Sequence, residues 1–272
     1  MSEVLARILA TKTDEVTVLH EPATRATILE AALATAPPRD FGSALHGNGA
    51  LAVIAEIKRR SPSKGDLAPG LDPTVLASAY EAGGAACLSV LTDQLYFGGT
   101  VADLQDARAA TGLPVLRKDF TIDEIQVYET RAIGADAVLL IAAAVPDDAL
   151  LGDLRTLASE LGLAALVEVH NERELERSLA AGATLIGVNS RDLTTFGEDL
   201  DVAERLIERL PADVVTVAES AIRSPADAQR MADAGFDAVL VGEALVRAEN
   251  PAAAVRALAN VQRRGQGSEA AG

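Results

Sequence analysis

The stretch Ile54-Ala-Glu-Ile-Lys-Arg-Arg-Ser-Pro-Ser-Lys-Gly65 begins as an apolar strand and ends as a cationic loop. Successive side chains of a strand point to opposite faces, so Glu56 and Lys58 share one face. A carboxylate and an ammonium are costly to bury on an apolar strand unless they are paired or used. Two interpretations fit the stretch equally well: a salt bridge beside a solvated basic loop, or the entrance to a site for an anionic small molecule.

From Leu51 onward, short apolar segments alternate with amphipathic segments of helical spacing. Predicted strands lie near residues 51–57, 85–91, 114–118, 136–141, 163–168, 184–188, 213–218 and 237–241. Predicted helices lie near residues 73–82, 100–110, 123–132, 146–161, 171–180, 200–209, 224–233 and 243–263. The strands are apolar on both faces, which is typical of a buried parallel sheet. Eight strand–helix units in succession favour a closed (β/α)8 TIM barrel, of the α/β class, over an open doubly wound sheet.

The chain divides into three predicted regions. Residues 1–50 lack the alternation, and helical spacing at 2–10 and 22–35 predicts an N-terminal helical extension that packs on the barrel. The barrel is expected over residues 51–263. The polar, glycine-rich residues 264–272 predict a disordered tail.

Composition excludes several classes of protein. The formal charge of the 272 residues is −16, which makes nucleic acid and anionic membrane surfaces poor partners. A single cysteine, Cys87, excludes a disulfide framework and fits a reducing compartment. The N-terminus does not resemble a signal peptide, and no apolar run reaches the length of a membrane span. We therefore expect a cytoplasmic protein, and we favour a monomer.

Charged residues at the carboxyl ends of barrel strands are typical of an active site. Lysines and glutamates that face one another in a dry pocket shift each other's pKa values, which supplies an acid and a base without a metal. The alternative is a structural ring of ion pairs around the barrel rim. The candidates, in strand order, are Glu56, Lys58, Lys118, Glu168, Asn189, Arg191, Glu219, Ser220 and Gly242.

A phosphate site is predicted at the loops after the seventh and eighth strands, where barrels commonly bind phosphate. The small residues Ser220, Ala221 and Gly242 would leave backbone N–H groups accessible to an anion. Ser61 and the cations of the first loop could complete the shell. Ordinary short loops, which also favour small residues, remain the alternative.

The histidines do not predict a metal site. His20 and His46 precede the barrel. His170 could face Glu168, but beside Asn171 we interpret it as part of a helix start. Cys87 lies in the middle of a predicted strand, which indicates a core residue rather than a nucleophile.

Segments at nearly every predicted strand end form one ordered pattern. They are residues 54–65 (IAEIKRRSPSKG), 89–93 (SVLTD), 96–99 (YFGG), 116–120 (LRKDF), 166–170 (LVEVH), 186–193 (IGVNSRDL), 218–220 (AES) and 240–244 (LVGEA). The pattern, from about residue 3 to residue 260, resembles the indole-3-glycerol-phosphate synthase family of tryptophan biosynthesis. That family is a (β/α)8 barrel whose N-terminal helical extension covers the active site.

The resemblance implies a carboxy-lyase that needs neither cofactor nor metal. Its substrate would be 1-(2-carboxyphenylamino)-1-deoxyribulose 5-phosphate, which loses carbon dioxide and water as the ring of indole-3-glycerol phosphate closes. By resemblance, Lys118 is the general acid, Glu168 the general base, and Lys58 the partner of the substrate carboxylate. Supporting catalytic residues would be Glu56, Asn189 and Glu219, and the phosphate and substrate shell would be Ser61, Arg191, Ser220, Ala221, Gly242 and Glu243.

Ala221 departs from the family pattern, which usually has glycine there. If this position needs a positive φ, alanine would cost on the order of 1 kcal/mol. We expect at most a modest loss of substrate affinity.

Two other functions remain open. One is a different phosphosugar barrel, an isomerase or aldolase, although such relatives need not share the pairs Glu56/Lys58 and Lys118/Glu168. The other is a catalytically silent paralogue that binds the substrate without turnover. A silent paralogue predicts the loss of an acid or a base, and neither is missing from this sequence.

Overall fold

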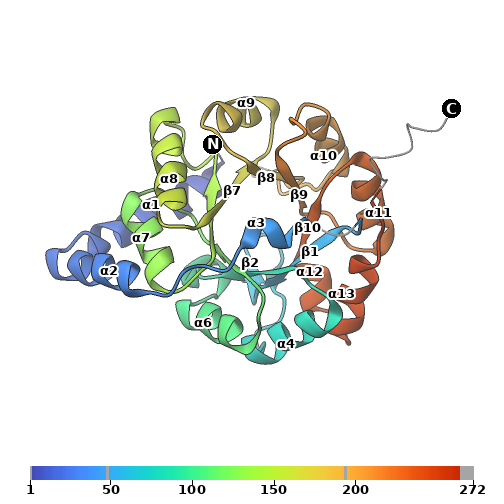
Figure 1. Ribbon diagram of the computed structural model, residues 1–272, viewed down its shortest axis with the longest axis horizontal. Helices are drawn as coiled ribbons and strands as arrows, with labels where there is room; N and C mark the ends of the chain where they lie inside the picture. Colours follow the sequence, from blue (N-terminus) through green and yellow to red (C-terminus); the bar gives the residue numbers. More distant parts are fainter. Residues whose placement is uncertain (1, 47–48, 193–194, 264–272) are drawn as a thin grey trace.

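The computed structural model describes residues 2–46, 49–192 and 195–263. In this part of the chain, eight parallel strands form a closed barrel surrounded by helices (Figure 1), which confirms the predicted (β/α)8 fold. The barrel closes where the first strand pairs with the last, with Ala52 opposite Ala238. The barrel strands are β1 (Ala52–Ile57), β4 (Cys87–Leu91), β5 (Val115–Lys118), β6 (Ala137–Ile141), β7 (Ala164–Val169), β8 (Leu185–Asn189), β9 (Val215–Glu219) and β10 (Ala238–Val241).

The outer helices begin where capping residues predict. Asp72, Asp123 and Ser224 each accept hydrogen bonds from backbone amides of the following first turn, which satisfies donors that a helix leaves unpaired. The outer helices are α4 (Pro73–Gly83), α6 (Val101–Ala110), α7 (Glu124–Ala132), α8 (Asp148–Glu160), α9 (Glu172–Ala180), α10 (Leu200–Ile207), α11 (Pro225–Ala234) and α13 (Pro251–Ala259).

Short elements occupy three of the loops. The loop after β1 contains the antiparallel pair β2 (Arg60–Ser61) and β3 (Gly65–Asp66), and α5 (Gln94–Phe97) follows β4. The third short element, α12 (Glu243–Val246), follows β10.

The prediction of a single helix over residues 243–263 is wrong. This segment is divided into α12 and α13, because Asn250 caps a new helix and Pro251 occupies its first turn.

The barrel interior changes character along its axis. Inward-facing Ile54, Leu116 and Leu166 pack together in a buried apolar cluster, which also contains Cys87, as predicted for a core residue. Phe41 of α3 (Phe41–Ala44) packs on this cluster near the starts of the strands, so α3 covers the amino-terminal end of the barrel. Polar inward residues therefore gather at the opposite, carboxyl-terminal end.

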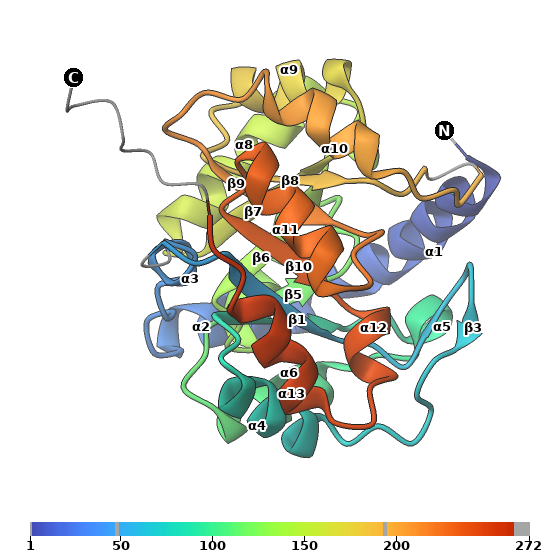
Figure 2. The same cartoon turned by 90° about the vertical axis from the view of Figure 1, so that its right-hand side faces the viewer.

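Two further helices precede the barrel, as predicted. α2 (Pro22–Ala34) packs against α7, and α1 (Glu3–Leu19) lies on the same side of the barrel as the β2–β3 hairpin and α5 (Figure 2). α1 is longer than the predicted segment 2–10. Its second half is rich in threonine and valine, which weaken the helical signal, and the hydroxyls of Thr13 and Thr17 donate to carbonyls one turn earlier.

The division into an extension of residues 1–50 and a barrel of residues 51–263 stays a prediction. Residues 264–272, predicted to be a tail, lie outside the described residues. Across the ranges that the structure describes, no helix combines the length and apolarity needed to cross a membrane.

Candidate active site

All the predicted site residues line one cavity of about 450 Å³ at the carboxyl-terminal end of the barrel. They come from loops and strand ends that are far apart in the sequence, and barrel closure brings them together. They are Glu56, Lys58, Ser61, Lys118, Glu168, Asn189, Arg191, Glu219, Ser220, Ala221, Gly242 and Glu243.

A lysine between two glutamates forms the centre of the cavity. Lys118 Nζ at the end of β5 lies 2.8 Å from Glu168 Oε2 on β7 and 2.5 Å from Glu219 Oε2 on β9. Asn189 on β8 donates from Nδ2 to Glu168 Oε1 at 3.1 Å. Glu168 and Glu219 are buried and Lys118 is nearly so, so their charges interact with little screening by water.

The pKa values of this centre diverge. Burial and the repulsion from Glu168 raise the pKa of Glu219 to about 7, although the attraction of Lys118 acts in the opposite direction. Burial would also raise the pKa of Glu168, but Lys118 and His170 hold it well below its usual range. Burial would lower the pKa of Lys118, but the surrounding carboxylates raise it above its usual value. Near neutral pH the cavity therefore holds an ionised carboxylate, an ammonium and a carboxyl that titrates.

Glu56 and Lys58 form a second pair at the rim. As the strand alternation predicts, they lie on one face, and Lys58 Nζ donates to Glu56 Oε1. The Oγ of Ser89 on β4 lies 3.5 Å from Glu56 Oε2. A Cβ at Gly242 would overlap Glu56 Oε1, so glycine at the end of β10 leaves the space that this carboxylate occupies.

The loops after β9 and β10 form the side of the cavity predicted to hold phosphate. Ser220 and Ala221 both have positive φ, 65° and 61° respectively. Arg191 extends into this region, but its guanidinium already donates to Glu198 and to Ser63 Oγ. Arg191 is therefore a paired cation, and its contact with Ser63 links the loop after β8 to the loop after β1.

His170 has a larger role than its interpretation as part of a helix start. Asn171 does cap α9, and His170 Nδ1 lies 3.0 Å from Glu174 Oε2 on that helix. Its other ring nitrogen lies 3.3 Å from Glu168 Oε1. Burial would lower the pKa of His170, but Glu168 and Glu174 together raise it to about 10. A protonated His170 thus adds positive charge behind Glu168.

Several residues that line or shape the cavity escaped sequence reasoning. A Cβ at Gly187 would overlap Glu219 Oε1, and a glycine inside a strand was a usable signal of such a close approach. Leu5 and Ile8 of α1 add an apolar wall. Phe97 and Phe120 continue this wall, with ring centroids 6.1 Å apart. Both phenylalanines lie in segments that carry the family resemblance, but no role in the cavity was predicted for either of them.

The histidines and carboxylates do not gather into a metal site in the part of the chain that the structure describes: no group of three His, Cys, Asp or Glu side chains there is arranged to hold an ion. His20 instead lies 2.9 Å from Asp123. That pair joins the end of α1 to the start of α7.

Comparison with known proteins agrees with this geometry. A solved structure, the thiamine phosphate pyrophosphorylase from Pyrococcus furiosus, aligns with a TM-score of 0.58 at 17% identity, over 79% of this chain and 96% of that one. At that identity the likeness shows the fold alone.

Sequence comparison is more specific. The family model described as indole-3-glycerol phosphate synthase matches residues 5–258. A protein of that name from Polaromonas naphthalenivorans is 48% identical over 95% of this chain and 99% of its own length. Another of that name, from a Nocardioides species, is 54% identical over 89% of this chain and 93% of its own length. The chain therefore belongs to the indole-3-glycerol phosphate synthase family.

Proposed function

We propose that the protein is an indole-3-glycerol-phosphate synthase that acts on 1-(2-carboxyphenylamino)-1-deoxyribulose 5-phosphate. The observation that carries the proposal is the ammonium of Lys118 between Glu168 and Glu219 in a buried cavity. This arrangement supplies a proton donor and a proton acceptor within a few ångströms of each other. Relatives that match nearly the whole chain carry the same name.

The reaction begins with carbon–carbon bond formation. Lys118 donates a proton to the ketone oxygen while the aromatic carbon that bears the carboxylate attacks the ketone carbon. That carboxylate leaves as carbon dioxide, and its bonding electrons restore the aromatic ring. Lys58 is the proposed partner of the substrate carboxylate, and its pairing with Glu56 limits its freedom.

Dehydration completes the product. The new hydroxyl leaves as water when an acid protonates it, and Glu168 removes a proton from the ring carbon beside the nitrogen. An acid is therefore needed twice. Glu219 lies 2.5 Å from Lys118 and has a pKa raised to about 7 by burial, so it can return a proton to Lys118 between the two steps.

The two ends of the substrate have different chemistry, and so do the two sides of the cavity. Leu5, Ile8 and Phe120 suit the aromatic ring. The phosphate is proposed to bind on the opposite side, through the small residues of the loops after β9 and β10. The proposed shell comprises Ser61, Arg191, Ser220, Ala221, Gly242 and Glu243. Asn189, through its bond to Glu168, is proposed to orient the base.

The test is a fluorescence assay for indole-3-glycerol phosphate formation from the proposed substrate, in the presence of a metal chelator. We expect wild-type turnover to survive chelation and Lys118→Ala to lose at least about a thousandfold in kcat. Arg25→Ala removes a half-exposed cation of α2 and is the matched control, with unchanged turnover.

A wild type that binds this substrate without turnover would contradict the proposal and identify the silent paralogue. Turnover only of another phosphosugar would identify an isomerase or aldolase. Activity that disappears with the chelator would contradict the metal-free mechanism.

We also propose that the protein works as a cytoplasmic monomer without a nucleic-acid partner. The formal charge of −16 disfavours binding to nucleic acid, and the single cysteine fits a reducing compartment. The predicted site residues of one chain meet in a single cavity, which supports a site that one copy can form. Light scattering at 28.2 kDa would support the monomer, and twice that mass would contradict it.

A further inference from the structure

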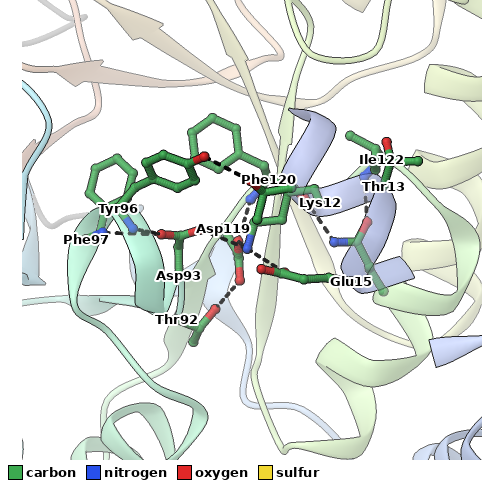
Figure 3. Close-up of polar contacts among 12 residues, drawn as sticks. Lys12, Thr13, Glu15, Thr92, Asp93, Tyr96, Phe97, Asp119, Phe120 and Ile122 are labelled. Carbon is green, nitrogen blue, oxygen red and sulfur yellow. Dashed lines mark hydrogen bonds and ion pairs between the residues drawn. The ribbon is translucent and has the colours of Figure 1, made fainter. Parts of the chain in front are cut away.

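Lys12 of α1 is a buried cation outside the set of proposed catalytic residues. Its side chain is 2% exposed, and its Nζ lies 2.9 Å from both Asp93 Oδ2 and Asp119 Oδ1 (Figure 3). Asp93 follows β4 and Asp119 follows β5. A charge from the N-terminal extension thus joins two adjacent strand ends of the barrel. Glu15, also 2.9 Å away, is a half-exposed third partner.

The two aspartates are themselves held firmly. Asp93 Oδ1 accepts the backbone N–H groups of Tyr96 and Phe97 at 2.7 and 3.2 Å, which caps α5. Asp119 Oδ2 accepts the Thr92 hydroxyl at 2.6 Å. Arg117 also pairs with Asp119, through Oδ2 at 3.4 Å. Because both carboxylates are fixed and buried, the ammonium that bridges them has one place to lie. Burial would lower the pKa of Lys12, but Asp119 and Asp93 raise it above its usual value.

The same contact lies beside the substrate cavity. Ile8 and Leu5 stand one and two helical turns before Lys12, and both line the cavity. On the barrel side, Asp119 lies between Lys118 and Phe120, which line it too. The position of α1 along the barrel rim therefore sets the shape of the apolar wall.

The other contacts of α1 hold it less specifically. Apolar side chains such as Leu5 and Val16 attract through burial, which has no preferred direction and tolerates sliding. Thr11 Oγ1 lies 2.9 Å from the hydroxyl of Tyr96, which adds a polar contact at the same site. A buried ion pair, in contrast, is satisfied at one geometry only.

We propose that Lys12 is a positioning residue: its ion pairs with Asp93 and Asp119 fix α1 as a wall of the substrate cavity. The kinetic part of this inference rests on the proposed function. The structural part does not, since it concerns only the attachment of α1.

The first test is Lys12→Met, which keeps the apolar stem and removes the charge. We expect amide hydrogen exchange in residues 3–19 to accelerate at least about tenfold while exchange in the barrel strands is unchanged. We expect KM to rise about tenfold and kcat to fall less than about threefold, because the wall and not the proton-transfer centre is disturbed. Arg7→Met, an exposed cation of the same helix, is the matched control and should change neither quantity.

A second variant covers the case in which Lys12→Met fails to fold because the buried Asp93 loses its cation, whereas Asp119 still pairs with Arg117 at 3.4 Å. Lys12→Met combined with Asp93→Asn keeps the oxygen that caps α5 and removes the negative charge that Lys12 no longer neutralises. We expect this double variant to fold, with α1 still exchanging rapidly and KM still raised. Wild-type protection of α1 and wild-type KM in either variant would overturn the inference.

The two proposals fail in different ways. A wild type without the proposed turnover, but with α1 released in Lys12→Met, would count against the enzyme assignment and for the attachment. An active wild type whose α1 exchanges identically in Lys12→Met would count against the attachment alone.

Discussion

Ser220 and Ala221 are consecutive residues in the left-handed region, with φ of 65° and 61°. Non-glycine residues pay about 1–2 kcal/mol for that conformation. Ala221 also lines the cavity and packs against the outer core, so its surroundings hold the strained backbone in place.

Replacing Ala221 with glycine should relieve this strain. We expect Ala221→Gly to raise the free energy of unfolding by about 1 kcal/mol at most, because the greater freedom of unfolded glycine offsets part of the relief. We expect KM to fall less than about tenfold, since the backbone N–H is already present. Chemical denaturation and steady-state kinetics measure the two effects.

Ala143→Gly, in a loop where φ is not positive, is the matched control and should lose about 0.5–1 kcal/mol. A hundredfold gain in substrate affinity in Ala221→Gly would show that the alanine is a functional defect and not a tolerated strain.

Single residues also show what the sequence can and cannot predict. Alternation along a strand was enough to predict that Glu56, Lys118 and Glu168 point inward, because successive side chains of a strand always point to opposite faces. The same rule does not reach Lys12. Its partners Asp93 and Asp119 lie far along the chain, and no local pattern links a lysine in a polar helical segment to them.

Two helical glycines of the outer layer have opposite surroundings. A Cβ on Gly83, the last residue of α4, would lie 2.6 Å from Ala252 O and 2.8 Å from Val255 Cβ, both on α13. A Cβ on Gly152, within α8, would meet nothing within 4 Å. Gly83 is therefore a site of close helix packing, and Gly152 is not.

The same substitution at the two positions should have opposite effects. We expect Gly152→Ala to raise the free energy of unfolding by about 0.5–1 kcal/mol through helix propensity. We expect Gly83→Ala to lower it by about 1–2 kcal/mol, because the clash with α13 exceeds the gain in propensity. Urea denaturation midpoints measure both, and a shift in the same direction for the two variants would contradict this account of the α4–α13 contact.

Regular elements were more predictable than short ones. The barrel strands lie within two residues of their predicted bounds, because buried strands between capped helices give two independent signals. α3, α5 and the β2–β3 hairpin escaped prediction, since each is too short to show a period. The break between α12 and α13 was readable at Asn250-Pro251, but the apolar spacing on both sides obscured it.

The molecule as a whole should show the raised pKa of Glu219 in the pH dependence of its stability. Burial raises that pKa from 4.5 in the unfolded chain to about 7 in the fold, so the folded state holds this proton more tightly. Glu219 therefore contributes its full stabilisation at pH values below 4.5, the pKa of this group in the unfolded chain. This stabilisation is lost as the pH rises towards about 7, its pKa in the fold.

Glu219→Gln should remove that part of the dependence. We expect the free energy of unfolding to fall less steeply in the variant than in the wild type between about pH 5 and pH 7. Urea denaturation at several pH values measures the difference. Glu204→Gln, at a partly exposed carboxylate of α10 that pairs with Arg230, is the control and should keep the wild-type slope in that range. Equal slopes in wild type and Glu219→Gln would mean that the carboxyl is already ionised in this range.

The pairing of the first barrel strand with the last affects how the chain can fold while it is being synthesised. β1 leaves the ribosome early, but its partner β10 emerges only when nearly the whole chain has been translated. Until then the nascent sheet has two open edges, which are surfaces prone to aggregation. The cavity draws residues from strands throughout this span, so a prematurely terminated product has no catalytic chamber. We therefore expect such fragments to be bound by chaperones or degraded, and not to act as weak versions of the enzyme.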